Sequence, residues 1–161
     1  MLPADLPILS LLIWTPIVGG LWVLASGAKN PPAARTTALA VSLFTFLLSL
    51  PLYWDFDVTT AQMQFVERVP WIEAFGIHYH LGVDGFSMPL IVLTTFTTVL
   101  VVIAAWEVIQ YKTAQYMAAF LIMEGLMNGV FAALDAILFY VLWEAMLIPM
   151  FLIIGIWGGP N

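Results

Sequence analysis

Cysteine is absent from this 161-residue sequence, and lysine and arginine together number only four. Without cysteine there is no disulfide, no thiolate metal site, and no iron–sulfur or haem-attachment motif. Four scattered basic residues make no basic stripe, so no nucleic-acid partner is expected. The sequence also lacks a glycine-rich dinucleotide loop, a phosphate loop and a nucleophile elbow. This chain is therefore not expected to move a hydride or an electron by itself.

Apolar residues dominate what is present. They make up 63% of the chain, charged residues make up 9%, and the mean hydropathy is +1.02. Soluble domains contain about 25% charged residues, so the composition predicts an integral protein of the lipid bilayer. The amino terminus carries Asp5 where a signal peptide would be positively charged, and we expect it to lead directly into a membrane helix.

Five apolar windows are long enough to cross a bilayer, which takes about 20 helical residues. We predict an all-α fold, a polytopic transmembrane helix bundle that forms a single domain over residues 1–161. The five helices are expected at about 6–24, 36–53, 86–109, 116–134 and 136–156.

Three cations predict the orientation of the bundle. Lys29, Arg35 and Lys112 fall between helices or at helix ends, and such residues mark the cytoplasmic side. The amino terminus and the acidic loop 54–83 are then on the outer, periplasmic side. Within that loop, residues 69–72 and 75–81 predict a short hairpin, and Asp84 is placed to cap the third helix.

The run 136–156 is apolar except for Glu144, and it contains Pro149. At about 1.5 Å per residue Glu144 lies about 12 Å into a span of about 30 Å. A carboxylate at that depth costs about 2.5 to 3.5 kcal/mol or more, so such acids usually serve ions or protons. Pro149 leaves the Ala145 carbonyl without its helical donor, which opens a point of approach. A permanently protonated, structural Glu144 is the alternative.

The preceding helix carries a second acid, Glu124. Glu124, Asn128 and Asp135 are spaced by four and seven residues, which predicts one polar face turned towards protein or water. We expect Glu124 to belong to an ion path. For Asp135, capping of the next helix and a position at the path entrance remain equally open. Gly125 and Gly129 are expected to allow close helix packing.

Two further groups are weak candidates. The threonines of the third helix are expected to bond back to the preceding turn instead of lining a hydrated path: Thr94, Thr95, Thr97 and Thr98. His78 and His80, with Glu73 and Asp84 nearby, lack the further histidines of a zinc site, so no metal site is predicted.

At this point the residues resemble a known family. Residues 116–161, and LGVDGFSMPL at 81–90, are similar to the antiporter-like membrane subunit M (subunit 4 type) of bacterial respiratory complex I, NADH:quinone oxidoreductase. The similarity is specific in the last 46 residues and looser in the first two helices. It implies a fourteen-helix fold with two inverted five-helix repeats, of which this chain is an N-terminal fragment.

The resemblance also implies roles for residues. Glu144 would be the glutamate of the glutamate–lysine pair of a proton channel, Glu124 the second membrane glutamate of that half-channel, and the channel lysine would lie beyond Asn161. The implied function is proton translocation coupled to quinone reduction. FMN, iron–sulfur clusters and quinone are expected in the parent complex, and none in this chain.

The resemblance places the chain in a bacterial inner membrane, beside other membrane-arm subunits and especially neighbouring antiporter-like subunits. Three alternatives stay open: a subunit of a multisubunit Na+/H+ antiporter, a subunit of a membrane hydrogenase, and a structural membrane scaffold.

Overall fold

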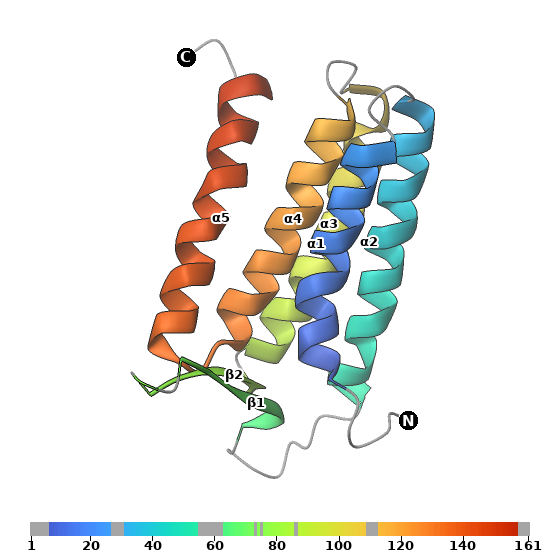
Figure 1. Cartoon of the computed structure of the whole chain (residues 1–161). Coiled ribbons are helices and arrows are strands. Elements are labelled where there is room, and N and C mark those ends of the chain that lie inside the picture. The colour runs from blue at the N-terminus through green and yellow to red at the C-terminus, as the bar shows by residue number, and fades with distance from the viewer. Residues whose placement is uncertain are drawn as a thin grey trace.

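The computed structural model describes residues 7–26, 31–54, 63–72, 74, 76–85, 87–108 and 113–157. The chain forms, in order, α1 (Ile8–Ser26), α2 (Pro31–Trp54), β1 (Gln64–Ile72), β2 (Ile77–Val83), α3 (Ser87–Val108), α4 (Thr113–Ala132) and α5 (Ala136–Trp157). Successive helices run in opposite directions, and the β1–β2 hairpin lies across one end of the bundle (Figure 1). We call this the hairpin end; α1, α3 and α5 begin there.

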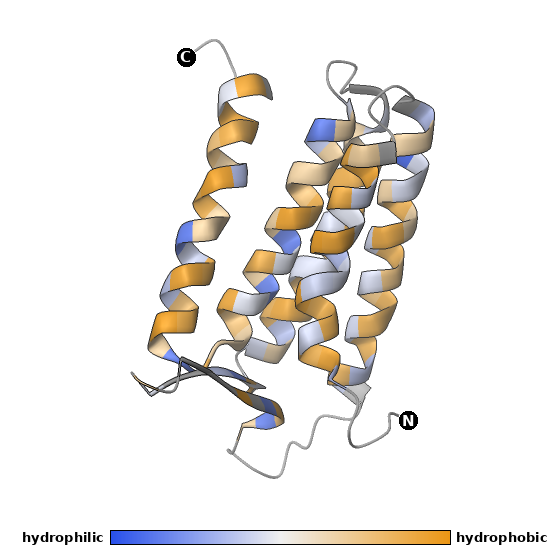
Figure 2. Ribbon diagram, in the orientation of Figure 1, coloured by the Kyte–Doolittle hydropathy of each residue, from blue (hydrophilic) through white to orange (hydrophobic). Residues whose placement is uncertain are grey.

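Within the described residues, four helices are long and apolar enough to cross a membrane: Ile8–Ala25, Pro32–Tyr53, Ser87–Trp106 and Ala136–Ile156. The prediction of five such helices therefore fails for α4, which carries Glu124 and Asn128. Figure 2 shows hydrophilic positions, in blue, within the apolar colour of α4. The helix nevertheless contacts each of the other four helices. Because α4 is enclosed by protein, it can hold polar residues that a lipid-facing helix would not.

Helices α2 and α4 begin furthest from their predicted positions. Helix α2 begins at Pro31 and not at residue 36, because a proline in the first turn removes an N–H group that has no partner there in any case. Helix α4 begins at Thr113 and not at 116, and it ends at Ala132 and not at 134. The early end of α4 changes the position of Asp135, as described below.

The hairpin predicted within residues 54–83 is confirmed and is longer than expected. Strand β1 pairs antiparallel with β2, with a bulge after Gln64, where Phe65 has a φ of 56°, and a turn that contains Gly76 with a φ of 68°. The Leu134 N–H donates to the His80 carbonyl at 2.8 Å, between α4 and α5. The hairpin is thus attached to the junction of the last two helices.

The hairpin also caps the first helix. Glu67 Oε2 accepts from the N–H groups of Leu9 and Ser10 at 2.8 and 3.1 Å, and the Ser10 hydroxyl donates to Glu67 Oε1. The Tyr79 hydroxyl lies 2.9 Å from Ser10 Oγ and accepts from Trp14 Nε1 at 3.1 Å. The first N–H groups of a helix have no partner within it, and a carboxylate there also suits the helix dipole. Glu67 therefore fixes α1 to the hairpin.

Candidate functional site

Buried polar side chains lie between two apolar cores. One core, at the hairpin end, includes Leu9, Leu52, Ile91, Val130 and Leu138; the other includes Val23, Ala38, Val102, Ala105 and Met117. Along α2, α3 and α4, seven buried polar residues fall in sequence between members of the two cores: Ser42, Thr45, Ser49, Thr95, Thr98, Glu124 and Asn128. We call these seven residues the polar layer. It occupies the middle of the bundle, where polar groups are costly and usually have a function.

The hydroxyl groups of the layer bond mostly within their own helices. Thr94, Thr95 and Thr98 donate to the carbonyls of Leu90, Val92 and Thr94 at 2.8 to 2.9 Å, as predicted. One contact joins two helices: Ser49 Oγ of α2 lies 2.8 Å from Thr95 Oγ1 of α3. Since each hydroxyl has a single hydrogen, most of these side chains offer only lone pairs to further partners.

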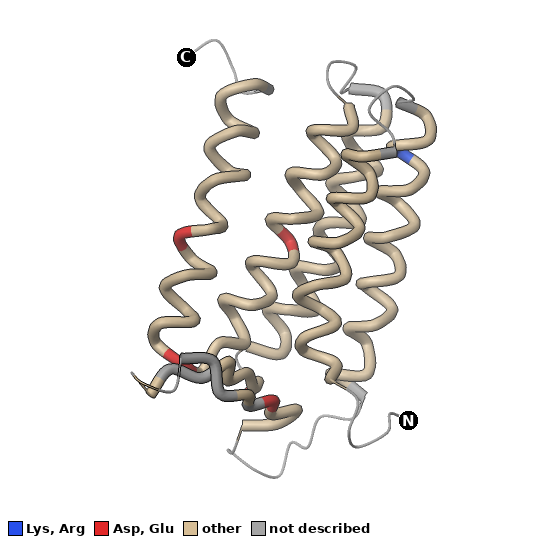
Figure 3. The backbone as a smooth tube through the Cα atoms, in the orientation of Figure 1, with Lys and Arg blue, Asp and Glu red and all other residues tan. Residues whose placement is uncertain are grey.

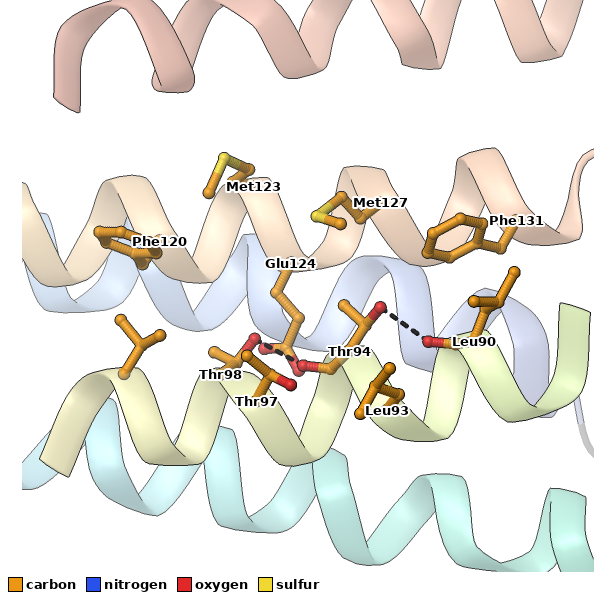
Figure 4. A pocket seen from close by; sticks show the side chains of 11 residues that line it. Leu90, Leu93, Thr94, Thr97, Thr98, Phe120, Met123, Glu124, Met127 and Phe131 are labelled. Carbon is orange, nitrogen blue, oxygen red and sulfur yellow. Dashed lines mark hydrogen bonds between the residues drawn. The ribbon is translucent and has the colours of Figure 1, made fainter. Parts of the chain in front are cut away.

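Glu124 is 1% exposed, and neither of its carboxyl oxygens has a hydrogen-bond partner among the described residues. It lines a pocket of about 280 Å³ between α3 and α4, and its carboxyl group points towards the threonines of α3, Thr94, Thr97 and Thr98 (Figure 4). An ionised, unpaired carboxylate at such a place is strongly unfavourable. The predicted inward direction of Glu124 is confirmed.

Asn128 lies one helical turn after Glu124 and is also 1% exposed. Its Nδ2 donates to the carbonyl of Leu12 in α1 at 2.9 Å. In a helix that carbonyl would bond to the N–H group four residues later, but the residue there is Pro16, which has none. Asn128 therefore supplies the donor that the proline removes.

The two glycines of α4 are packing residues, as predicted. A Cβ atom at Gly125 would lie 2.2 Å from the backbone oxygen of Ile13 in α1. At Gly129 it would lie 2.8 Å from a methyl group of Leu142 in α5. Only the absence of a side chain lets α1 approach α4 closely enough for the bond between Asn128 and Leu12.

Glu144 faces away from the rest of the chain. The buried residues of α5 are Leu138, Leu142, Met146 and Pro149, which share one face, while Glu144 is exposed. Residues two positions apart on a helix lie on nearly opposite faces. The exposed face has a shallow groove of about 430 Å³ lined by Glu144 and Ala145, with four apolar neighbours: Leu147, Ile148, Phe151 and Leu152. Ala145 is the residue whose carbonyl loses its donor to Pro149.

The structure does not bring the predicted acids together. Glu124 points into the α3–α4 pocket, and Glu144 lies on the face of α5 that the other helices leave uncovered. Among the side chains coloured in Figure 3, acidic positions occur inside the bundle, on α5 and at the hairpin end, and a basic position lies at the opposite end. That basic residue is Arg35, in the first turns of α2. Arg68 lies in β1 at the hairpin end, Glu107 lies in the last turn of α3, and Lys29 and Lys112 lie outside the described residues.

Asp135 caps α5. Its Oδ1 accepts from the N–H groups of Ile137 and Leu138 at 2.9 and 3.1 Å. Because α4 ends at Ala132, Asp135 does not continue the polar face of Glu124 and Asn128, and the prediction of one shared face was wrong for it. Asp84 caps α3 as predicted, since its Oδ1 accepts from the Ser87 N–H at 2.9 Å.

No three histidines, aspartates or glutamates gather as metal ligands within the described ranges. Of the four residues considered for metal, Glu73 lies outside those ranges.

Part of the polar layer escaped prediction. Ser42, Thr45 and Ser49 are fully buried on α2, and their spacing of three and four residues is the signal that marks them as one face. The pairing of Asn128 with Leu12 has no such signal, because a sequence does not show which carbonyl a distant amide reaches.

Together the fold and the polar layer define a class: a multi-pass helical membrane protein with a carboxyl group enclosed in its bundle. The family of NADH-ubiquinone oxidoreductase chain 4, amino terminus, matches residues 9–133. The chain belongs to this family. A relative from Rhodobacter capsulatus is called NADH-quinone oxidoreductase subunit M.

Individual relatives support this family assignment. Subunit M of Rhodobacter capsulatus is 46% identical over 158 residues, which cover 96% of this chain and 30% of the relative. Chain 4 of Arabidopsis thaliana is 43% identical over 150 residues, which cover 93% and 30%. A chain of the respiratory complex I from Thermus thermophilus with bound NADH superposes with a TM-score of 0.76 and 27% identity, over 92% of this chain and 29% of that one. The chain thus spans about 30% of the length of these relatives.

Proposed function

We propose that this chain is the N-terminal part of a proton-translocating membrane subunit of NADH:quinone oxidoreductase, in which Glu144 and Glu124 bind protons. Membership of the subunit M family supports the complex, and the other membrane-arm subunits, especially antiporter-like ones, are the proposed partners. FMN, iron–sulfur clusters and quinone then belong to the rest of the complex. Arg35, at the end opposite the hairpin, supports a periplasmic hairpin end in a bacterial inner membrane.

The observation that carries the proposal is the position of Glu144. It lies on an apolar helix face that the rest of the described chain leaves uncovered, beside the carbonyl of Ala145 that has lost its helical donor. A carboxylate on a membrane helix requires a cation, a hydrogen-bond donor or a proton. We infer that a basic side chain from the remainder of the subunit or from a neighbour occupies this groove and pairs with Glu144. Proton exchange at Glu144 then follows the making and breaking of that pair.

Glu124 is the second proton-binding group in this proposal. It is enclosed, has no hydrogen-bond partner and adjoins a pocket large enough for several water molecules. Those waters would carry protons to and from the carboxyl group. Asp135 lies between the two acids along the chain and has a demonstrated capping bond, so we assign it to capping first and to the path entrance second.

The test is Glu144→Gln in the complete complex. Proton pumping by membrane vesicles that oxidise NADH should fall severely, while the complex still assembles, because glutamine keeps the shape but cannot ionise. Tyr140→Phe, one turn earlier on the same exposed side of α5, is the matched control and should pump normally. Full pumping by Glu144→Gln would contradict the proposal.

The full burial of Glu124 without a counter-charge favours one other candidate, a structural scaffold whose acids stay protonated. Infrared titration separates the two, because a scaffold carboxyl would remain protonated throughout turnover and tolerate Glu124→Gln. Uptake of Na+ in place of H+ by the same vesicles would instead indicate an antiporter of the Na+/H+ type.

A further inference from the structure

Three buried oxygen atoms of α4 accept no hydrogen bond from the part of the chain that the structure describes: the two carboxyl oxygens of Glu124 and Oδ1 of Asn128. Their residues are one helical turn apart, so the side chains are neighbours on one face. Buried acceptors without a donor are costly and rare in native proteins. A hydrogen-bond donor is therefore required beside these oxygen atoms.

The orientation of the Asn128 amide is determined by α1. The Leu12 carbonyl can only accept, and it lacks its backbone donor because of Pro16, so it binds the NH2 side of the amide at 2.9 Å. The Oδ1 of Asn128 is consequently directed away from Leu12. It can be satisfied only by a hydrogen from another group.

The side chains around Glu124 do not supply this hydrogen. Of the threonines in the pocket, Thr94 and Thr98 donate to α3 carbonyls, and Thr97 is exposed and forms no bond with Glu124 (Figure 4).

Titratable residues on the packed helices lie elsewhere. Helix α1 contains none, and α3 contains only Glu107, in its last turn. Helix α2 carries Arg35 and Tyr53 near its two ends. Helix α5 carries Tyr140 and Glu144 on its exposed face. Helix α4 itself carries Tyr116 in its first turns. Among the described side chains, the remaining source of the hydrogen is a proton on Glu124 itself.

We propose that Asn128 is a positioning residue for the proton site at Glu124, accepting the hydrogen of the protonated carboxyl through Oδ1 while its Nδ2 holds the Leu12 carbonyl of α1. This inference rests on the proposed function of Glu124 as a proton-binding group. In this state the acid donates to the amide oxygen, and the amide donates to the carbonyl beside Pro16. The second carboxyl oxygen of Glu124 is left to accept from water in the α3–α4 pocket.

When Glu124 releases its proton, it can no longer donate a hydrogen bond and can only accept one. The O–H bond of Glu124 breaks, the electron pair stays on the carboxylate, and the proton passes to a water molecule in the α3–α4 pocket. The carboxylate then accepts hydrogen bonds from water in that pocket, while Nδ2 of Asn128 stays on the Leu12 carbonyl. Asn128 therefore stabilises the protonated state of Glu124 only.

The experiment uses the complete complex and infrared titration of the carboxyl C=O band, which is identified by its loss in Glu124→Gln. Asn128→Leu removes the acceptor of the acid proton, so we expect the band to disappear at a pH about one unit lower, a tenfold change in proton affinity. This variant also leaves the Leu12 carbonyl without a donor, so it should assemble poorly.

Pro16→Ala separates the two effects. Alanine restores the backbone N–H for Leu12, so the double variant Pro16→Ala/Asn128→Leu should regain assembly and still show the shifted titration. Pro51→Ala, which removes a proline from α2, is the matched control and should not rescue Asn128→Leu. The inference is overturned if the double variant titrates like the wild type, since Asn128 would then have a structural role alone, or if wild type shows no band that Glu124→Gln removes. Normal pumping by Glu124→Gln would instead refute the proposed function of Glu124, whatever the titration shows.

Discussion

Replacement of Gly125 by alanine tests how closely α1 and α4 approach each other. The added Cβ atom would lie 2.2 Å from the Ile13 backbone oxygen, where an ordinary contact is at least 3.4 Å, so the helices must separate by roughly 1 Å. Overpacking of this kind costs about 1 to 3 kcal/mol. The separation also strains the neighbouring bond between Asn128 and Leu12, worth about 1 kcal/mol. Against this, alanine gains about 1 kcal/mol over glycine in a helix interior. The net loss of stability is expected to be about 1 to 3 kcal/mol.

Gly155→Ala provides the matched control. Gly155 lies within α5, and a Cβ atom there meets nothing within 4 Å, so only the helix gain remains and the variant should be neutral or slightly more stable. Unfolding of the full-length subunit in mixed micelles, titrated with a denaturing detergent and followed by helical circular dichroism, measures both variants. If Gly125→Ala unfolds at the same detergent fraction as Gly155→Ala, the close approach of α1 and α4 is not part of the native structure.

Three other substitutions test the polar contacts. Glu67→Gln should lower stability by about 1 to 2 kcal/mol, because a charge-assisted cap of α1 becomes a neutral one; detergent titration measures the loss, and an unchanged midpoint would contradict the cap. Ser49→Ala should cost about 1 kcal/mol in the same assay through its lost contact with Thr95, and no loss would show that this contact is weak. Asp135→Asn keeps the capping oxygen and removes the charge, so stability should stay within about 0.5 kcal/mol and pumping should be normal; slowed pumping with normal stability would place Asp135 at the path entrance.

Much of the fold followed from local patterns. Long apolar runs predicted every helix, and Asp84 predicted the start of α3, because a cap depends on residues that are close in sequence. The hairpin was predicted as well, but its extent was not. Its first residues pair under the constraint of the helix ends and of Glu67, which bonds to α1 at a separation of 58 residues. Helix α4 was judged by its apolar content, whereas its enclosure by four other helices is a property of the assembled bundle.

The candidate site, like the fold, was predicted from local patterns only in part. Spacing along one helix predicted the inward direction of Glu124 and Asn128, and it failed for Asp135 because the helix ends before that residue. Depth within an apolar run singled out Glu144, but its exposed face could not be foreseen. The rotation of a helix about its axis depends on its neighbours, here on the contact of Leu142 with Gly129. Relations between helices are therefore the part that a sequence alone leaves undetermined.

The bond between Asn128 and the Leu12 carbonyl has a consequence for biosynthesis. The two residues are 116 positions apart, so α1 is synthesised, and inserted, long before its donor exists. A carbonyl without a partner in the hydrocarbon core costs several kcal/mol. During that interval the segment around Pro16 must remain beside the insertion machinery or near water, which supply hydrogen bonds. Helix α1 thus reaches its final environment only when α4 arrives, 116 residues after Leu12 is synthesised.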